Sequence, residues 1–375
     1  MRTALAGFGT TVFTEFSALA ERTGAINLGQ GFPDEDGPAE VLEAAAAALR
    51  DGHNQYAPLA GVPALRRAIA EHQRRFYGLE VDPDRGVQVT FGATEAIAAA
   101  LLGLCEPGDE VLALDPAYDS YAAAAALAGA TLVRVPLHPP GWALDPAELA
   151  AAVTARTRVL LLNSPHNPTG RVLSRGELEA VAAVCAERDL IAVTDEVYEH
   201  LVFAGEHTPL ATLDGMAGRT LTISSLGKTF SVTGWKTGWA TGPPELVGAV
   251  RAAKQFLSFA GGTPFQHAGA AALRLPDAAY TAVAEDLRRK RDRLCDGLTA
   301  AGVAVLRPQG TYFANADVGG DADAFCRELP ERAGVVAIPT GVFSAFAHCD
   351  RLVRFAFCKR PGVIDEAARR LAALG

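Results

Sequence analysis

Short runs of β-branched and aliphatic residues recur along the middle of the chain. They predict six strands, at residues 87–91, 111–115, 131–137, 158–163, 191–195 and 220–225. Ala- and Leu-rich stretches between several of them predict helices, at 95–104, 119–128 and 176–188. Strands that are apolar on both faces and alternate with helices are typical of a parallel sheet covered on both sides. We therefore expect an α/β fold with a mostly parallel central sheet. Residues 238–242 are one more short strand candidate, for which we consider an antiparallel direction.

The pattern changes in the last third of the chain. We expect one long helix over 266–301 and strands near 335–338 and 352–357, which together indicate a smaller α+β unit. The N-terminal segment has no partner strand nearby, so we expect it to pack on that unit. The expected organisation is an N-terminal arm at 1–36, a large α/β domain at 37–265 and a C-terminal small domain at 266–375.

Polar residues gather where the expected strands end. Gly92 to Thr94 follow the first strand, Asn163 to Asn167 the fourth, Asp195 ends the fifth, and Ser224 and Ser225 end the sixth. In open α/β sheets, ligands bind at the carboxyl ends of the strands. The sequence therefore predicts a single site at this edge.

The composition disfavours several other functions. The formal net charge of −9 provides no positive surface for nucleic acid. No stretch reaches the roughly 18 apolar residues of a membrane span, and the N-terminus does not resemble a secretion signal. The six cysteines form no C-x-x-C pair, and no His cluster has metal-ligand spacing. We expect a cytoplasmic protein with reduced, buried thiols and no metal.

Lys228 is the first candidate for chemistry, in S-S-L-G-K-T-F directly after a strand. A lone lysine is normally a solvated surface charge. Here Gly227 and the preceding serines let the backbone approach an anion closely. A lysine desolvated among small residues has a lowered pKa and becomes a usable nucleophile. Together with Lys236, it suits a phosphate held beside an aldehyde.

Asp195, in T-D-E-V-Y, either caps a helix or a turn, or pairs with a pyridinium nitrogen and keeps it protonated. Tyr198 could then bond a phenolic oxygen of the same ring. Asn163 and Asn167, in N-S-P-H-N-P-T-G, either shape a tight turn or present amides to a ligand. Arg354 interrupts the apolar strand L-V-R-F-A-F and needs a partner, which is either an internal acid or a substrate carboxylate.

Together these motifs resemble the class I aminotransferases of fold-type I, which depend on pyridoxal 5′-phosphate (PLP). The resemblance covers nearly the whole chain and is carried by eight motifs in order. They are N-L-G-Q-G-F-P-D at 27–34, N-Q-Y at 54–56, G-A-T-E-A at 92–96, D-P-A-Y at 115–118, N-S-P-H-N-P-T-G at 163–170, T-D-E-V-Y at 194–198, S-S-L-G-K-T-F at 224–230 and R-F-A-F at 354–357. Within the class, the chain is similar to the kynurenine, glutamine and methionine aminotransferases, to cysteine-conjugate β-lyases, and most of all to actinobacterial N-succinyldiaminopimelate aminotransferases.

The resemblance implies a role for each residue around the cofactor ring. Lys228 would hold the cofactor covalently and later move the proton between the substrate and the cofactor. Asp195 would bind the pyridine nitrogen, Asn167 and Tyr198 the ring oxygen, and Tyr118 would stack on the ring face. These expectations make Lys228, Asp195 and Tyr198 the catalytic group.

The resemblance also implies how the phosphate is held. Ala93 and Thr94 would bind it mostly through backbone N–H groups, with Ser225 and Lys236 beside them. Tyr56 would reach the phosphate of the neighbouring subunit, so the expected active unit is a homodimer. Many members of the class have Arg where this chain has Lys236, and lysine supplies a point charge without the guanidinium fork.

For the substrates, the resemblance implies an amino acid and a 2-oxo acid such as 2-oxoglutarate. Arg354 would bind the α-carboxylate, with Gly31, Asn167 and Phe13 beside it. Kynurenine-type relatives carry an aromatic residue and a His where this chain aligns Ala260 and Gly261, which implies a wider pocket for a longer, polar substrate.

Three alternatives remain beside the transaminase. A PLP-dependent β-lyase acting on cysteine S-conjugates would share every cofactor residue. A PLP-binding sensor domain is usually joined to a basic DNA-binding segment, and this chain has none. A nicotinamide dehydrogenase is disfavoured because the glycine-rich fingerprint after a strand is missing.

Overall fold

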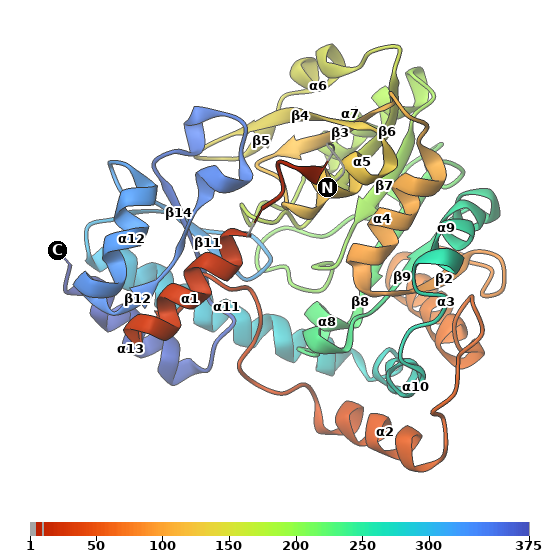
Figure 1. Cartoon of the computed structure of the whole chain (residues 1–375), viewed down its shortest axis with the longest axis horizontal. Helices are drawn as coiled ribbons and strands as arrows, with labels where there is room; N and C mark the ends of the chain where they lie inside the picture. Colours follow the sequence, from red (N-terminus) through yellow and green to blue (C-terminus); the bar gives the residue numbers. More distant parts are fainter. Residues whose placement is uncertain (1–4, 10, 375) are drawn as a thin grey trace.

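The structure is a computed structural model and describes residues 5–9 and 11–374. Its centre is an eight-stranded sheet in the order β2-β9-β8-β7-β6-β3-β4-β5 (Figure 1). The strands are β2 Val87–Phe91, β3 Glu110–Asp115, β4 Thr131–His138, β5 Ala143–Leu144, β6 Thr157–Asn163, β7 Ile191–Asp195, β8 Thr220–Ser225 and β9 Thr237–Thr241. The five neighbours from β8 to β4 run parallel, whereas β9 is antiparallel to both β8 and β2. The predicted α/β fold and its strands are confirmed, including the antiparallel direction of β9.

Helices cover both faces of this sheet because successive side chains of its buried strands point to opposite sides. Residues such as Val111 and Leu161 pack against α4, α5 and α9, and residues such as Leu112 and Leu160 pack against α7 on the other face. The helices α2, α3 and α10 pack at the β2–β9 end. The bounds are α2 Ala39–Arg50, α3 Pro63–Tyr77, α4 Gly92–Leu104, α5 Ser120–Ala128, α6 Pro146–Ala152, α7 Arg175–Glu187, α8 Leu226–Thr229, α9 Pro244–Leu257 and α10 Thr263–Ala272.

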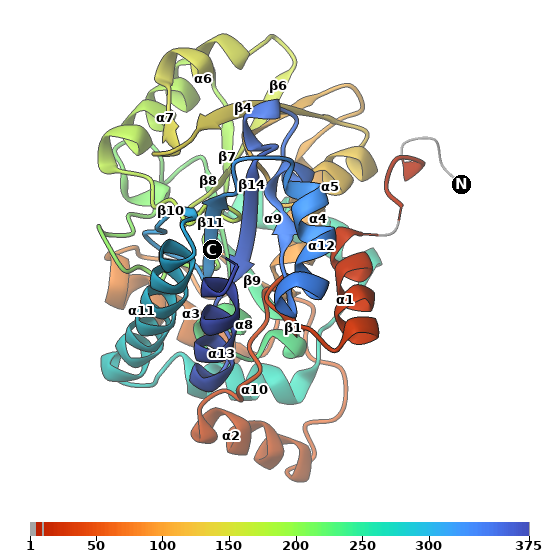
Figure 2. The ribbon, with the colours of Figure 1, turned by 90° about the vertical axis from the view of Figure 1, so that its left-hand side faces the viewer.

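A second sheet of four antiparallel strands, in the order β10-β11-β14-β13, lies beside the large one (Figure 2). Its strands are β10 Ala304–Leu306, β11 Phe313–Asp317, β13 Ile338–Pro339 and β14 Leu352–Ala356, and its flanking helices are α11 Asp277–Ala300, α12 Ala322–Ala333 and α13 Pro361–Ala372. Strand β12 (Val335–Val336) lies outside this sheet. The single long helix expected over 266–301 is wrong, since α10 ends at Ala272 and α11 begins at Asp277. Pro276 explains the break, because proline disfavours helical geometry in the residue before it.

The N-terminal segment lies against this second unit (Figures 1 and 2). Helix α1 (Val12–Thr23) is followed by β1 (Ile26–Asn27), which pairs in parallel with β12 through Ile26 and Val335. Phe16 and Leu28 are buried in the same apolar cluster as Val336 and Phe355. Residues 26 and 27 thereby pair with a strand that lies more than three hundred positions later in the sequence.

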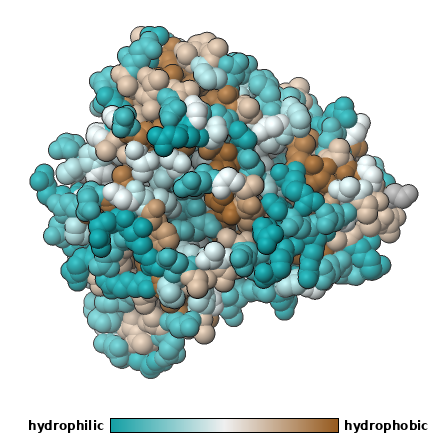
Figure 3. Space-filling view, turned by 180° about the vertical axis from the view of Figure 1, so that it is seen from behind, coloured by the Kyte–Doolittle hydropathy of each residue, from teal (hydrophilic) through white to brown (hydrophobic). Residues whose placement is uncertain are grey.

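The surface is mostly polar on the back face, with apolar side chains in small separate areas (Figure 3). All six cysteines are buried, and none forms a disulfide within the part of the chain that the structure describes. Within residues 5–9 and 11–374, no helix is long and apolar enough to cross a membrane.

One buried carboxylate joins the two sheets. Asp115, at the end of β3, accepts hydrogen bonds from Arg134 Nη1 (2.7 Å), from the backbone N–H of Ala345 (3.0 Å) and from the Ser344 hydroxyl. Arg134 Nη1 also donates to the carbonyl of Phe343 (2.9 Å). Residues 343–345 follow β13, so this contact holds the small unit at the carboxyl edge of the large sheet.

We predict that Asp115→Ala lowers the free energy of unfolding by about 2–4 kcal/mol, because it leaves Arg134 and two other donors without their acceptor. Chemical denaturation measures this change. Glu179→Ala is the matched control, since it removes an exposed partner of Arg175 and should cost at most about 1 kcal/mol. Equal effects of the two substitutions would contradict the proposed importance of Asp115.

Candidate active site

A cavity opens where the two sheets meet, at the carboxyl ends of the parallel strands. It is lined by twelve of the thirteen residues predicted for the site, namely Phe13, Gly31, Ala93, Thr94, Tyr118, Asn167, Asp195, Tyr198, Ser225, Lys228, Lys236 and Arg354. The thirteenth, Tyr56, does not line it. Strand ends position most of the set: Asp195 ends β7, Ser225 ends β8, and Ala93 is the second residue of α4, which directly follows β2.

Lys228 projects from the short helix α8 into the cavity. Its Nζ lies 5.9 Å from the ring centroid of Tyr198 and 5.6 Å from that of Tyr312. Desolvation by burial lowers the pKa of Lys228 to about 8, although the negative charge of Asp195 acts to raise it. A substantial share of the amine is therefore neutral near pH 8, as a nucleophile or proton acceptor requires.

Asp195 is buried and has a donor that the sequence did not reveal. The Tyr121 hydroxyl donates to Asp195 Oδ2 at 2.7 Å, and the N–H of Val197 donates to Oδ1 at 3.3 Å. Burial raises the Asp195 pKa to about 6, while the bond from Tyr121 acts in the opposite direction. The Ala-rich helical context of Tyr121 is typical of a core aromatic. Tyr118 precedes that helix and makes an edge contact with the Tyr121 ring, with centroids 5.6 Å apart.

Two asparagines link Asp195 to Arg354. Asn163 Nδ2 donates to the backbone carbonyl of Asp195 (2.8 Å), and its Oδ1 accepts from the N–H of Asn167 (2.7 Å). Asn167 Oδ1 then accepts from Arg354 Nη1 at 3.0 Å. The loop from Asn163 to Asn167 is thus a rigid connection between the large sheet and β14.

Arg354 is almost wholly buried, with 1% of its surface exposed. Its guanidinium carbon lies 4.1 Å from the ring centroid of Phe313 and 4.5 Å from that of Phe343, and Nη2 donates to the carbonyl of Gly29 (3.2 Å). Burial lowers its pKa to about 10. Among the described residues no carboxylate lies within ion-pair distance, and Nε has no hydrogen-bond partner. The guanidinium fork is therefore available to a carboxylate from outside the chain.

The opposite end of the cavity is suited to an anion. Gly92 has φ +77°, a backbone conformation that favours glycine, and a Cβ there would lie 3.3 Å from Lys236 Nζ, so the lysine lies close to the start of α4. Lys236 itself has φ +51°, a backbone conformation that is costly for a residue with a side chain. Free N–H groups in the first turn of a helix, next to a lysine, form a ready site for phosphate.

The N-terminal arm closes the remaining side. Phe13, Gln30, Gly31 and Phe32 all line the cavity. A Cβ on Gly31 would lie 2.5 Å from the Phe313 ring, and the Gly31 carbonyl accepts from the Tyr312 hydroxyl at 2.5 Å. Glycine is therefore required here by the close approach of the arm to β11.

Tyr56 lies elsewhere, on the surface. Its side chain is 86% exposed and makes an edge contact with Phe259, with ring centroids 5.7 Å apart. Phe256 is similarly exposed, at 85%. Ala260 and Gly261, expected in the substrate pocket, are also absent from the lining of this cavity. Within a single chain, none of these residues reaches Lys228.

Comparison with known proteins agrees with this arrangement. A family model for class I and II aminotransferases matches residues 23–371. The chain belongs to the class I and II aminotransferases. This aminotransferase is 56% identical over 383 residues to a probable N-succinyldiaminopimelate aminotransferase of Mycobacterium tuberculosis, with 98% of this chain and 96% of that relative covered. It is 41% identical over 371 residues to a methionine aminotransferase of Escherichia coli, with coverage of 98% and 96%.

Solved structures support the same assignment. The N-succinyldiaminopimelate aminotransferase from Mycobacterium tuberculosis superposes with a TM-score of 0.98 over 100% of both chains. The Escherichia coli methionine aminotransferase superposes with a TM-score of 0.96, over 100% of this chain and 99% of the other. The predicted family, fold and transaminase activity are therefore confirmed, and the substrate remains to be assigned.

We predict that Tyr121→Phe moves the acid limb of the transaminase pH profile to higher pH. The Tyr121 bond lowers the Asp195 pKa, so its loss makes ionisation of Asp195 require a higher pH. A bond to a charged group contributes about 1.5–3 kcal/mol, so we expect kcat/KM to fall roughly tenfold or more at pH 6. Tyr280→Phe is the control because its hydroxyl bonds Leu273 instead. Coincident pH profiles for Tyr121→Phe and wild type would exclude this role.

Proposed function

We propose that this aminotransferase uses PLP, bound in the cavity through Lys228, and that N-succinyldiaminopimelate is its amino donor. The observation that carries the chemistry is the arrangement of Lys228, Asp195 and the unpaired Arg354 around one cavity. The donor rests on the 56% identical relative from Mycobacterium tuberculosis that carries that activity in its name.

The residues present fit the proposed cofactor. A neutral amine is available at Lys228 for its aldehyde, and a buried carboxylate at Asp195 for its ring nitrogen. The anion site of Ala93, Thr94, Ser225 and Lys236 fits its phosphate. Burial of Asp195 without a cation is unfavourable, and a protonated ring nitrogen would supply the missing charge. Tyr198 and Asn167 supply an O–H and an N–H to the space between these groups.

In the proposed reaction the protein binds, orients and moves protons. When bound, PLP supplies a ring that accepts the electron pair left by loss of the Cα proton. Lys228 would remove that proton from the substrate Cα and deliver it to the cofactor carbon that carried the aldehyde, since its pKa near 8 suits both steps. Arg354 holds the α-carboxylate and thereby directs the Cα–H bond toward Lys228. Such positioning favours proton loss over loss of CO₂.

We also propose a homodimer in which Tyr56 completes the partner's phosphate site. Support comes from the exposure of Tyr56, Phe256 and Phe259 on a surface that the cavity of the same chain does not use. Exposed aromatic side chains on one surface are typical of an interface. In a dimer Ala260 and Gly261 would also contact a substrate pocket, namely the pocket of the partner subunit.

For the domains, we propose an N-terminal arm, a large domain and a small domain, with the last boundary in the break at 273–276. Residue 265, the boundary expected from the sequence, lies inside α10 (Thr263–Ala272). Ala270 and Ala272 of this helix pack with Val41, Leu65 and other residues of the large unit. The arm ends before α2, which begins at Ala39.

The donor is tested by single-turnover spectroscopy of the purified holoenzyme. Candidate donors are N-succinyldiaminopimelate, methionine, kynurenine, glutamine and a cysteine S-conjugate. Fast conversion of the cofactor to its amine form by N-succinyldiaminopimelate supports the proposal, and faster conversion by another donor replaces it with that donor. Pyruvate and ammonia from the S-conjugate alone would indicate a β-lyase. Lys228→Ala is the control, because it should lose both turnover and the absorption of the lysine-bound cofactor.

We predict that Arg354→Leu raises the KM for every amino donor roughly 10- to 100-fold while PLP stays bound, because a charged pair of hydrogen bonds is lost. Initial rates and the cofactor absorption spectrum measure the two effects separately. Arg351→Leu is the matched control, since Arg351 lies just before β14 and is largely exposed. An unchanged KM for all donors would exclude the proposed role of Arg354.

A further inference from the structure

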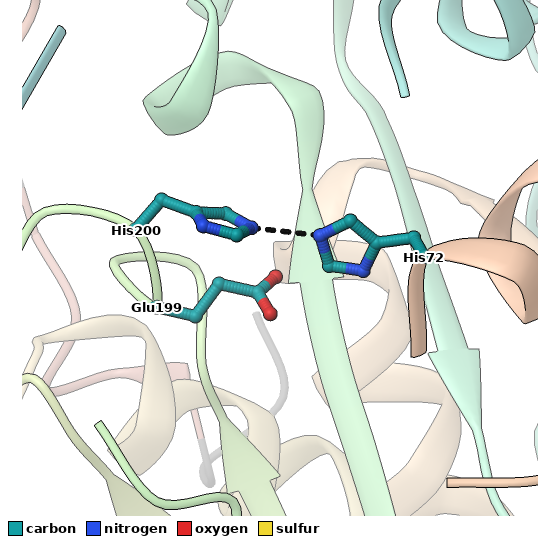
Figure 4. A group of neighbouring side chains, drawn as sticks. All are labelled: His72, Glu199 and His200. Atoms are coloured by element: carbon teal, nitrogen blue, oxygen red, sulfur yellow. Dashed lines mark hydrogen bonds between the residues drawn. The ribbon is translucent and has the colours of Figure 1, made fainter. Parts of the chain in front are cut away.

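A second group of potential ligands lies outside the cavity, between α3 and the segment after β7. His72 from α3 faces His200 and Glu199, as Figure 4 shows. The Nε2 atoms of the two histidines are 2.7 Å apart, and one ligand atom from each of the three residues lies within 4.8 Å of the others. Neither the transaminase reaction nor the cofactor site uses these side chains.

The two imidazoles are held only loosely by polar contacts. The Nε2 contact with His200 is the one hydrogen bond that His72 makes among the described residues, and its Nδ1 has no partner. A neutral imidazole has one nitrogen lone pair, and this is the group that a metal ion binds.

Glu199 is held in place for coordination by two other residues. The Tyr77 hydroxyl donates to Oε2 at 2.6 Å, and the Ser224 hydroxyl donates to Oε1. Each carboxylate oxygen keeps a second lone pair. Carboxylate ligands of metals are commonly oriented by hydrogen bonds of this kind. Tyr77 and Ser224 therefore fix the orientation of the carboxylate that would bind the ion.

Glu199 is the acidic member of the group, and its described hydrogen-bond donors are the neutral hydroxyls of Tyr77 and Ser224. Glu196 is paired with His207. Arg75 acts electrostatically on both imidazoles, and its charge is offset by an ion pair with Asp277. A buried carboxylate without a cation is unfavourable, and a bound ion would supply the charge.

We propose that His72, Glu199 and His200 bind one divalent transition-metal ion of the Zn²⁺ class. Two imidazoles and one carboxylate, with further positions left for water, form a known donor set for such ions. Tetrahedral Zn²⁺ with ligands at about 2.0–2.2 Å holds them roughly 3.3 Å apart. The two Nε2 atoms must separate slightly and the carboxylate must move closer, which side-chain rotations can achieve.

The ion would connect two distant parts of the large domain. His72 lies on α3, whereas Glu199 and His200 directly follow Asp195 to Tyr198, and Ser224 precedes Ser225. A cavity at the surface, lined by Glu71, His72, Arg74, Arg75, Leu273 and Arg274, provides a path to His72. Binding to the native state alone raises the melting temperature, and we expect a rise on the order of a few °C at saturation.

The proposal is tested by titrating metal-free holoenzyme with Zn²⁺ and with Co²⁺. We expect one tightly bound ion per chain and visible Co²⁺ absorption typical of low coordination number. His200→Ala should weaken Zn²⁺ binding at least tenfold. Tyr77→Phe should weaken it roughly 10- to 100-fold, because the hydrogen bond that orients the Glu199 carboxylate is lost. Circular dichroism checks that each variant is folded.

The matched control is His267→Ala, which breaks a second histidine pair, where His53 and His267 stack with centroids 3.8 Å apart. The proposal requires that Zn²⁺ affinity is unchanged in this variant. If Zn²⁺ binding survives His200→Ala but is lost in His267→Ala, the ion binds at the surface pair and the proposal is wrong. Absence of stoichiometric binding by the wild-type holoenzyme would overturn it equally.

Discussion

The site of this aminotransferase depends on one buried arginine. Arg354 lies within the small sheet, its guanidinium is surrounded by aromatic rings, and no carboxylate of the described chain pairs with it. A charge buried in this way is unfavourable unless it gains a partner. In the proposed function that partner is the substrate carboxylate, and the energetic cost of burying Arg354 would then contribute to affinity and orientation when the carboxylate binds.

The position of Arg354 in the cavity depends on hydrogen bonds that join the two sheets beside it. Asn167, held by Asn163 at the end of β6, bonds the guanidinium from the large sheet. Asp115, at the end of the neighbouring strand β3, holds residues 343–345, and with them the Phe343 ring that covers the guanidinium. Short hydrogen-bonded loops therefore hold Arg354 of the small sheet and Lys228, which follows β8 of the large sheet, around the same cavity.

The sequence predicted the central sheet well because its strands are apolar on both faces, and a parallel sheet brings their polar ends together. It also predicted twelve of the residues that line the cavity. It failed where identical residue types serve several purposes. The helical pattern over 266–301 contains Pro276, where the structure has a break between two helices. Tyr121 lies in a pattern typical of a core aromatic, although its hydroxyl bonds Asp195. The sequence around Asp115 did not indicate that its carboxylate bonds Ser344 and Ala345, which connect it to the second sheet.

What the sequence by itself determined is the set of local signals: the alternation of strands and helices, and the motifs that contain Lys228, Asp195 and Arg354. Periodicity and turn chemistry act between near neighbours, so they can be read along the chain. Only the tertiary structure decided which distant side chains meet. His72 and His200 come together although 128 positions separate them, and β1 pairs with a strand near the other end of the chain. Such contacts arise from the packing of whole elements, which no short stretch of sequence encodes.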